Sequence, residues 1–517
     1  MSVITRSGIK WPIDKDESGL VKLAEKELGV KPGYFAIRKK SLDARDKGNL
    51  HYLYTVEFAR ESLQPEKPSI ERLPQAKLPE KPVLIVGSGP AGLFCALRLW
   101  ERGIPSIVVE RGPCVEERAQ KIDRFCRERA LDVNGNVQFG EGGAGTFSDG
   151  KLNTQTHSPY NRHVLETFVR FGAPREILWL QKPHVGSDNL KNVVRNMRRF
   201  LIESGGQVRF DTLLTDLKTR DGELVEVSLK NLKTGVEERV EPACVVLAVG
   251  HSARDTFERL LARGVQMRQK EFAVGVRIEH LQSAVGLAQY GKAYTRLPAA
   301  DYKLVSHAHE RAAFTFCMCP GGVVMPAASE EGGVVTNGMS NYARDERNAN
   351  AALIAQVRQE DFGGEHPLAG VEFQRRLERA AFAAGGGDYR APAQKVGDFL
   401  QGKISARWGD ITPSYAAGTT FADMHAILPT GVCDSLKAAI IDMDRRLKGF
   451  ACPDAVLTGV ESRTSSPVRI ERGDNLQSVS VARLFPCGEG AGYAGGITSA
   501  AADGIRVADG VFIMLNG

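Results

Sequence analysis

The chain has 517 residues, which is more than one hydrophobic core supports and indicates two or three domains. Its composition, 42% hydrophobic and 25% charged, is that of an ordinary globular protein, and its 54 glycines gather in loops without a period, which excludes collagen-like and low-complexity chains. A net charge of +6 spread over this length suits an anionic ligand but lacks the dense basic stripe of a nucleic-acid-binding protein, so we expect no nucleic-acid partner.

Residues 1–62 are predicted to form a small α+β domain of ferredoxin-like βαββ type. Asp16–Leu28 has helical periodicity and is followed by Gly29, a typical C-cap. Gly33–Lys40 and Leu50–Phe58 have the pattern of strands. Residues 63–82 contain five prolines, which fix φ and remove hydrogen-bond donors, so we expect an extended, semi-rigid linker.

From residue 83 the pattern alternates between strands and helices. A strand, a helix and a second strand are predicted at Val83–Val86, Ala91–Arg102 and Ser106–Glu110, which together make a βαβ unit. Three more helices and three more strands are predicted at Val115–Ala130, Arg162–Phe171, Leu190–Glu203, Gln207–Phe210, Glu223–Lys230 and Ala243–Val249.

The pattern changes between about residues 266 and 455. Alternation and β-branching predict strands of a broader, partly antiparallel sheet at Phe272–Glu279, Ala312–Cys319 and Gly332–Asn337. Leu484–Leu515 then returns to a strand, a glycine-rich loop and a helix. We therefore predict an α/β fold: a Rossmann-like nucleotide-binding domain built from 83–265 and 456–517, with a mixed-sheet substrate or cap domain at 266–455.

The turn after the first buried strand reads VGSGPAG and has G-x-G-x-x-G spacing. Gly87 allows the tight exit from the strand, Gly89 lets amides approach a pyrophosphate, and Gly92 lets the helix pack closely. Glu110, about 20 residues on, can accept hydrogen bonds from both ribose hydroxyls and disfavours a 2′-phosphate. Because the turn also opens a helix whose free N–H groups attract phosphate, we predict dinucleotide binding by Gly87, Ser88, Gly89, Pro90, Ala91, Gly92 and Glu110.

The C-terminal segment favours FAD over NAD. It reads LFPCGEGAGYAGGITSAAADG, in which an acid follows a strand-ending glycine and a second glycine pair opens a small-residue helix. The acid can hold the ribityl chain of a flavin, and the helix N-terminus can stabilise negative charge on the reduced ring. NAD has no ribityl chain and needs no such second site, so this segment is predicted to contact a flavin through Gly488, Glu489, Gly496 and Ile497.

A second G-x-G-x-x-G match, made of Gly140, Gly142 and Gly145, has no good helix after it. We interpret it as a flexible loop over a ligand rather than a second fingerprint.

Six segments together resemble one family of bacterial FAD-dependent dehydrogenases of uncharacterised substrate, within the glutathione-reductase-like flavin fold. They are VGSGPAGLFCAL, VQFGEGGAGTFSDGKL, HVGSDNL, FCMCPGG, GVESRTSSPVRI and PCGEGAGYAGGI, and the N-terminal SLDARDKG is similar too. The resemblance implies non-covalent FAD on the glycine turn, with Glu110 and Arg111 beside it and Arg118 as a phosphate or ribose contact. It also implies that the Gly142–Thr146 loop, with Gly143, lies along the cofactor, that Gly250 closes a strand beside it, and that Glu489, Gly496 and Ile497 serve the ribityl chain and ring.

Several polar loops carry candidate chemistry, although no catalytic base is assigned from sequence. Cys317 and Cys319 end a strand pattern, so their sulfurs share one face; a reactive pair or a metal site competes with two small buried thiols near the flavin, which we favour. Further substrate-contact candidates lie in loops, where solvated or capping roles compete: Asp149, Lys151, His184 and Arg463. Asp188 fits an N-cap before Leu190–Glu203.

These features predict an FAD-dependent oxidoreductase that moves a hydride to or from flavin N5, with an unknown small or lipid-like substrate and an unidentified electron donor or acceptor. Isoprenoid double-bond reductase and flavin monooxygenase are alternatives. An alternative of a different class is an RNA-associated flavoprotein, in which the basic run Arg38-Lys39-Lys40 and stacking aromatic residues of the first domain bind RNA: Tyr34, Phe35, Tyr52 and Tyr54.

The sequence shows neither an apolar run long enough to span a membrane nor a signal peptide, and its nine cysteines are scattered. Scattered cysteines in a large chain are typical of reduced thiols, so we expect a cytoplasmic protein.

Overall fold

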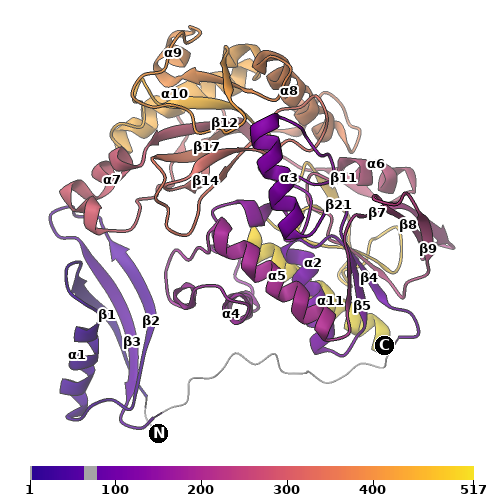
Figure 1. Ribbon diagram of the computed structural model, residues 1–517, viewed down its shortest axis with the longest axis horizontal. Helices are drawn as coiled ribbons and strands as arrows, with labels where there is room; N and C mark the ends of the chain where they lie inside the picture. Colours follow the sequence, from indigo (N-terminus) through magenta and orange to yellow (C-terminus); the bar gives the residue numbers. More distant parts are fainter. Residues whose placement is uncertain (1–2, 63–78) are drawn as a thin grey trace.

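The computed structural model of the chain describes residues 3–62 and 79–517. Most of the predicted proline-rich linker, residues 63–78, lies outside the described residues. The described chain forms a small N-terminal unit, a part built on a parallel sheet, and a large mixed sheet above it (Figure 1). Mixed α/β architecture with a Rossmann-like part confirms the predicted fold class.

The N-terminal unit, residues 3–62, has the predicted βαββ order. Its three strands form an antiparallel sheet in the order β1-β3-β2, and α1 covers one face through Leu20, Ala24 and Leu28. The helix ends at Gly29 in the left-handed conformation (φ 71°), as predicted. The elements are β1 (Ile4–Pro12), α1 (Ser18–Leu28), β2 (Tyr34–Asp43) and β3 (His51–Ala59).

Five parallel strands in the order β22-β10-β4-β5-β6 form the Rossmann-like sheet. Its last-numbered strand comes from the far end of the chain, so the two terminal segments of this part share one sheet. The predicted strands and helices are confirmed within a few residues: β4 (Val83–Val86), α2 (Pro90–Glu101), β5 (Ser106–Val109), α3 (Val115–Glu128), α4 (Asn161–Arg170), α5 (Ser187–Glu203), β6 (Gln207–Arg209), β10 (Val245–Leu247), β22 (Leu484–Pro486) and α11 (Ile497–Asn516).

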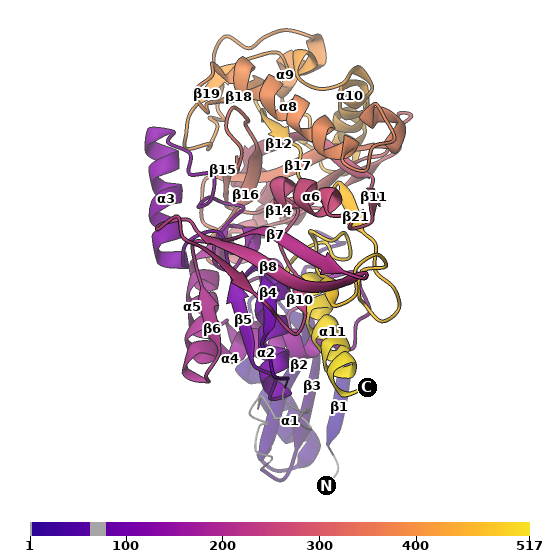
Figure 2. The ribbon, with the colours of Figure 1, turned by 90° about the vertical axis from the view of Figure 1, so that its right-hand side faces the viewer.

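The parallel sheet is the middle of three layers. Helices α2, α5 and α11 pack on the face that presents Val83 and Ile85, while a three-stranded antiparallel sheet packs on the face of Leu84 and Val86. Figure 2 shows this second sheet crossing in front of the parallel strands. This sheet consists of β7 (Thr212–Arg220), β8 (Glu223–Asn231) and β9 (Glu237–Val240), of which only β8 was predicted from sequence. The strand β7 was missed because it is rich in polar residues, and β9 and the neighbouring helix α6 (Arg254–Ala262) were missed because they are short.

A seven-stranded mixed sheet, in the order β13-β14-β17-β12-β20-β18-β19, covers the parallel part from above (Figures 1 and 2). The central strand β17 was missed because its sequence, NANAALIAQV, is alanine-rich and almost entirely buried, so no alternation marks it. The strands are β12 (Phe272–Leu281), β13 (Val305–Ser306), β14 (Ala313–Cys319), β17 (Asn348–Val357), β18 (Ala391–Lys395), β19 (Thr419–Phe421) and β20 (Val456–Glu461).

Two sequence predictions for this region need correction. The strand predicted at 332–337 is β16 (Thr336–Met339), which pairs with β15 (Val323–Pro326) in a separate two-stranded sheet. The strand β20, which the boundary after residue 455 assigns to the nucleotide-binding part, pairs with β12 and β18 of the mixed sheet. The remaining elements are β11 (Met267–Gln269), α7 (Gln282–Tyr290), α8 (Ala369–Gly385), α9 (Val396–Gln401), α10 (Thr430–Arg446) and β21 (Val468–Ile470).

The helices α2 and α11 approach each other closely where α2 begins. A Cβ added to Gly504 would lie 2.1 Å from the carbonyl oxygen of Ala91, so only glycine permits this contact. A Cβ on Gly92 would lie 1.9 Å from the carbonyl oxygen of Gly87, which holds α2 against its own turn. The start of α2 is thereby fixed against α11 at the eighth residue of that helix.

We expect Gly504→Ala to lower the free energy of unfolding by roughly 2 kcal/mol, because the new methyl group must push α11 away from α2. Alanine favours a helix interior over glycine, so a loss of stability can come only from the clash. Thermal unfolding measures the effect, and Arg506→Ala on the exposed side of the same helix is the control. An unchanged melting temperature for Gly504→Ala would contradict the close approach.

Candidate functional site

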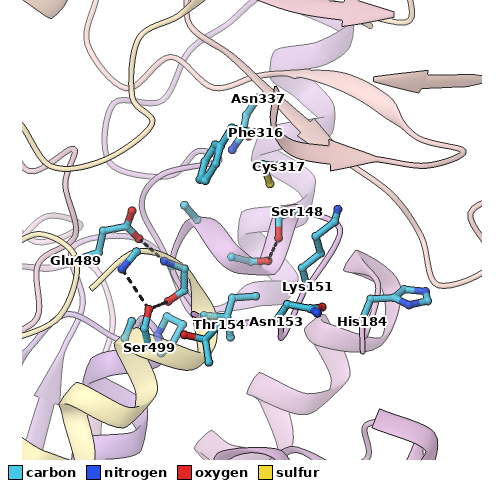
Figure 3. A pocket seen from close by; sticks show the side chains of 18 of the residues that line it. Ser148, Lys151, Asn153, Thr154, His184, Phe316, Cys317, Asn337, Glu489 and Ser499 are labelled. Atoms are coloured by element: carbon cyan, nitrogen blue, oxygen red, sulfur yellow. Dashed lines mark hydrogen bonds between the residues drawn. The ribbon is translucent and has the colours of Figure 1, made fainter. Parts of the chain in front are cut away.

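A cavity of about 1660 Å³ lies at the carboxyl ends of the parallel strands, below the mixed sheet and beside the N-terminal unit. Small-molecule sites commonly have volumes of roughly 300–1,000 Å³, so this one has room for a dinucleotide and a second ligand. In open α/β sheets, ligands bind outside the carboxyl ends of the strands. Figure 3 shows side chains that enter it from the loops below and the mixed sheet above.

The glycine turn, Gly87–Gly92, forms one wall of the cavity. Gly87, Gly89, Pro90 and Ala91 line it, whereas Ser88 and Gly92 point away into the protein. Gly87 has φ 106°, and a Cβ on it would lie 2.2 Å from the carbonyl oxygen of Ala248, so its glycine is required by the fold.

Gly89 differs from its neighbours in the turn. It has φ −71° and ψ −177°, a conformation open to any residue, and a Cβ on it would meet no atom closer than 3.7 Å. The protein's own packing therefore does not require glycine here. Because Gly89 has no side chain, the space on the cavity side, where α2 begins, stays open.

Glu110 lies beside the turn and lines the cavity with 6% of its surface exposed. Its Oε2 accepts hydrogen bonds from the backbone N–H and the hydroxyl of Ser88, both at 2.9 Å. Its Oε1 accepts from the N–H groups of Gly112 at 3.0 Å and Gly140 at 3.1 Å. The carboxylate thus ties three loops together, a role that the fingerprint alone did not reveal.

Arg111 lines the cavity at the end of the same strand. Its guanidinium lies 4.4 Å from the centre of the Phe139 ring and donates to both carboxylate oxygens of Asp255, at 2.8 and 2.7 Å. These contacts hold a positive charge and an aromatic face at the rim of the cavity.

Arg118 does not reach the cavity, so its predicted contact with phosphate or ribose does not fit this structure. Its side chain is fully buried, and its guanidinium donates to five backbone carbonyl oxygens between Asn136 and Gly143 at 2.6–3.2 Å. Burial lowers the pKa of Arg118 to about 10. A single arginine therefore fixes the shape of the loop that carries the second glycine match.

That loop is not the flexible flap predicted from its glycines. The N–H of Gly142 donates to the carbonyl of Ser88 at 2.9 Å, and a Cβ on Gly143 would lie 3.0 Å from Cα of Gly89. A short 3₁₀ helix follows at Ala144–Phe147. Gly143 lines the cavity, whereas Gly142 and Thr146 lie behind it against α5.

Gly250 and His251 follow β10 and line the cavity next to the glycine turn. Gly250 has φ 76°, and a Cβ on Gly490 would lie 2.4 Å from its carbonyl oxygen, so the two loops touch through their backbones. Burial, together with Arg463 and Arg254, lowers the pKa of His251 to about 3. His251 is therefore neutral at physiological pH.

The C-terminal segment forms the wall beside the glycine turn, where a Cβ on Gly488 would lie 2.7 Å from Cβ of Ala91. Glu489, Gly496 and Ile497 line the cavity, and α11 begins there (Figure 3). Gly488 does not line it; its N–H donates to Asp503 at 2.8 Å. Burial raises the pKa of Glu489 to about 7, against the hydrogen bond from the Gly496 N–H and the attraction of Lys270.

The mixed sheet contributes Cys317 to the cavity, while Cys319 is fully buried. A β-bulge between Phe316 and Cys319 interrupts the strict alternation assumed from sequence, and Cys317 has φ 43°. The hydrogen bond from Cys319, with Lys151 and Arg277 nearby, lowers the pKa of Cys317 to about 5 and outweighs burial. The pKa of Cys319 is raised, because Cys319 shares that hydrogen bond with Cys317 and because its thiol is buried.

A buried carboxylate organises the cations below Cys317. Asp149 has no exposed surface and accepts from Arg344 at 2.8 and 2.5 Å, and its carboxylate lies 2.9 Å from Nζ of Lys151. These partners hold the pKa of Asp149 at about 2 despite its burial. His184 stacks on Tyr342 with ring centres 5.1 Å apart, and both line the cavity.

Two other candidates from sequence have structural partners. Arg463 lines the cavity and donates to both carboxylate oxygens of Glu378, at 3.0 and 2.8 Å. Asp188 is not the N-cap of α5, which is Gly186; its carboxylate accepts from the N–H of Tyr342 at 2.8 Å instead. Asp188 therefore positions the loop that carries Tyr342 and Arg344.

Sequence reasoning missed several residues of the cavity. The N-terminal unit contributes Lys40 and Tyr52, the mixed sheet contributes Phe316 and Glu461, and the two-stranded sheet contributes Asn337. No local motif marks these positions, because only the packing of separate sheets brings them to one cavity.

Comparisons with known proteins bear on this site. A family model described as "FAD-dependent protein, C-terminal domain-like" matches residues 271–464, an FAD binding domain model matches residues 80–124, and a model of a domain of unknown function matches residues 4–59. The chain is 43% identical to an uncharacterized protein of Clostridium beijerinckii, in an alignment that covers 97% of each chain.

Two solved structures are similar in fold. A geranylgeranyl bacteriochlorophyll reductase-like protein from Thermoplasma acidophilum is 11% identical, over 85% of this chain and 80% of that one, with a TM-score of 0.37. A flavoprotein/dehydrogenase from Cytophaga hutchinsonii is 11% identical, over 85% of this chain and 78% of that one, with a TM-score of 0.34. Within residues 3–62 and 79–517, no helix is both long and apolar enough for a membrane span, and no group of His, Cys, Asp and Glu side chains could hold a metal ion.

We expect Arg118→Lys and Arg118→Met to lower the free energy of unfolding of the ligand-free protein by on the order of 3 kcal/mol, because neither side chain can satisfy five buried carbonyl groups. Chemical denaturation checks this. Lysine keeps the positive charge that a phosphate contact needs, so an Arg118→Lys variant with full stability and weakened nucleotide binding would contradict the structural role.

A pH effect follows from Glu489. Its pKa is raised to about 7, so its neutral form favours folding, and that contribution is lost as pH rises through 7. We therefore expect Glu489→Gln to stabilise the ligand-free protein at pH 8 by on the order of 2 kcal/mol and to have no effect near pH 4.5. Melting temperatures across this range measure the gap, with exposed Glu346→Gln as the control. A gap independent of pH would count against the raised pKa.

Proposed function

The chain belongs to a family of FAD-dependent proteins, and on that premise we propose that it transfers a hydride between FAD and a bulky organic substrate held under the mixed sheet. The protein is a flavoprotein and an FAD-dependent oxidoreductase. The substrate, the residues that bind the cofactor and the direction of transfer belong to the proposal.

One observation carries the proposed cofactor site: the beginnings of α2 and α11, from distant parts of the chain, line the same cavity. The fold itself does not require glycine at position 89, and the missing side chain of Gly89 leaves open the approach to the start of α2. This arrangement fits a long dinucleotide, with the pyrophosphate at Gly87–Ala91 and the flavin ring toward Gly496 and Ile497.

The residues on each side of this site have distinct proposed roles. Glu110 and Arg111 flank the adenosine end, and Gly143 and Gly250 line the path between the two walls. Glu489 faces the ribityl chain, where its raised pKa lets it donate or accept a hydrogen bond near neutral pH. Ser88, Gly92, Gly142, Thr146, Gly488 and Arg118 act from behind by shaping these loops.

When bound, FAD supplies a two-electron hydride acceptor or donor at N5 of its ring. The chain's own residues position the substrate, exclude water and handle protons. The mixed sheet and the N-terminal unit cover the cavity, and β2 docks on the main body through the carbonyl of Trp179, which accepts from the N–H of Lys40 at 2.8 Å. Lys151, held by buried Asp149, keeps a positive charge at the substrate side.

The upper part of the cavity favours an apolar substrate. Phe316 is 43% exposed and Val305 is 37% exposed, although both lie on strands of the mixed sheet, and both line the cavity with Trp179 and Tyr290. Exposed large apolar side chains in a concave wall are typical of ligand contact. Lys182 and Lys40, which line the same region, are paired with Asp301 and Glu17, so these two lysines do not call for an ionic ligand.

This lining is compatible with the lipid-like substrate predicted from sequence and with the isoprenoid reductase and monooxygenase alternatives. The RNA alternative gains no support. Tyr54 is buried, and Phe35 and Tyr52 pack against the core of the N-terminal unit, so these rings are not free to stack on bases. The electron donor or acceptor and the cytoplasmic location stay predictions.

We expect the purified protein to be yellow and to release FAD on denaturation, and Gly89→Ala to bind FAD at least tenfold more weakly. The added methyl group enters the space proposed for the pyrophosphate, while the backbone conformation and the 3.7 Å clearance leave the fold unstrained. Equilibrium dialysis of the ligand-free protein with FAD measures the affinity. Gly364→Ala, where a Cβ meets nothing within 4 Å, is the matched control.

Equal FAD affinity for Gly89→Ala and the control would contradict the proposed pyrophosphate position. A folded protein that takes up no FAD would contradict the proposed function. Anaerobic bleaching of the flavin by a panel of NADH, NADPH and candidate organic donors then identifies the reductant.

A further inference from the structure

We propose that Cys317 and Cys319 form a reactive dithiol on the substrate side of the cavity, where Cys317 attacks the sulfur of a disulfide and Cys319 resolves the product. This inference deepens the proposed function by naming an organic disulfide as the class of molecule that exchanges electrons with this site. It rests on the position of the two thiols and on the charges that surround them.

Cys317 is placed differently from the other cysteines. It lines the cavity at a β-bulge, in the left-handed conformation that side chains other than glycine rarely adopt. Residues held in such conformations concentrate at functional sites. The bulge turns the end of β14 so that Cys317 faces the cavity (Figure 3), while Cys319 is fully buried.

The ammonium group of Lys151 binds the chain segment that carries both thiols. Nζ of Lys151 donates to the carbonyl of Met318, the residue between the two cysteines, and pairs with Asp149 at 2.9 Å. Arg277 donates to the carbonyl of Cys317 at 3.0 Å from the other side. Cations held this close favour a thiolate over a thiol, and the thiolate is the nucleophile.

Anions also face Cys317, so the balance has to be considered as a whole. Asp149 neutralises part of the charge of Lys151, Glu461 is bidentate with Arg277, and Glu489 lies across the cavity. The hydrogen bond from Cys319 adds to the two cations, and together they lower the pKa of Cys317 to about 5. The lowered pKa favours the thiolate form of Cys317.

Five of the other cysteines differ from Cys317 in the direction in which their thiol pKa is shifted. Burial raises the thiol pKa of a group that includes Cys487, which also lines the cavity; its members are Cys95, Cys126, Cys244, Cys433 and Cys487. A buried thiol with a raised pKa is inert. Cys317 is thus distinguished from another cysteine of the same cavity by its charged neighbours.

The second thiol points to disulfide exchange rather than to attack on a carbon electrophile. A carbon electrophile needs one nucleophile, whereas disulfide exchange needs a second thiol to release the mixed disulfide. Cys319 donates through Sγ to the carbonyl of Cys317 at 3.3 Å, which keeps it beside the attacking residue. Its raised pKa holds it as a thiol until Cys317 has reacted.

The exchange balances in two steps. The Cys317 thiolate bonds to one sulfur of the substrate disulfide, breaking its S–S bond and releasing the first thiolate. Cys319 then loses its proton and bonds to Sγ of Cys317, which breaks the mixed disulfide and releases the second thiolate. The substrate has gained two electrons and the protein dithiol has lost two. A flavin, as in the proposed function, can transfer two electrons together.

The test incubates the full-length protein with 2-hydroxyethyl disulfide and maps its peptides by mass spectrometry. We expect wild type to lose two free thiols as a Cys317–Cys319 disulfide, Cys319→Ser to trap a mixed disulfide on Cys317, and Cys317→Ser to react at neither position. Cys114→Ser, which removes a partly exposed thiol elsewhere, should behave as wild type.

A second measurement tests the role of Lys151. Iodoacetamide should alkylate Cys317 in Cys319→Ser at pH 7, and Lys151→Met in that background should slow this reaction at least tenfold, with Lys151→Arg restoring much of the rate. Circular dichroism and melting temperature identify any variant that fails to fold. The arginine variant then carries the comparison, because it keeps the charge.

No mixed disulfide in Cys319→Ser, or alkylation of Cys317 no faster than that of Cys114, would overturn the inference. If the protein binds FAD but these thiols stay inert, only the dithiol site fails. If the thiols react but no FAD is bound, the proposed function fails and the dithiol site stands.

Discussion

The contact between α2 and α11 is the constraint on which the rest of the molecule depends. Two helices that begin about 400 residues apart can pack together at one cavity because Gly504 of α11 leaves room for the backbone of Ala91 at the start of α2. Gly92 in turn lets α2 pack against its own turn at Gly87. Each helix start carries unpaired N–H groups and the positive end of a dipole. In the proposed function, these helix starts bind the dinucleotide together with the side chains of Glu110, Arg111 and Glu489.

Buried arginines keep the walls of this site in place. Arg118 donates hydrogen bonds to five carbonyl groups of one loop. Arg254, at the start of α6, and Arg463 both donate to the carboxylate of Glu378, which lies on α8. A buried charge is costly unless it is fully paired, so such hubs permit few alternative arrangements. The loops are thereby arranged before any ligand arrives, which is what a flavin site needs in order to tune its cofactor.

The two halves of the cavity are built on different principles. The lower half presents glycines and helix starts, which recognise phosphate and ring without side-chain chemistry. The upper half presents side chains from the mixed sheet and the N-terminal unit, including Cys317, Phe316 and Tyr52. Substrate choice and reactivity therefore reside in the upper half, and the same lower half can serve different reactions when the upper half changes.

The sequence by itself determined the features that depend on neighbours along the chain. The turn at Gly87–Gly92, the acid at Glu110, the C-cap at Gly29 and most helices follow from local spacing, so the flavin cofactor and the Rossmann-like fold could be predicted. Tertiary structure alone decided the rest. Arg118 has the charge expected of a phosphate contact, but its guanidinium donates to the carbonyl groups of one loop. Asp188 has the position expected of an N-cap, but its carboxylate holds the loop of Tyr342. The alanine-rich strand β17 carries no periodic signal. The grouping of Lys151, Cys317 and Glu489 likewise depends on the packing of three separate sheets, because a side chain's partners and burial are set by segments far away in the chain.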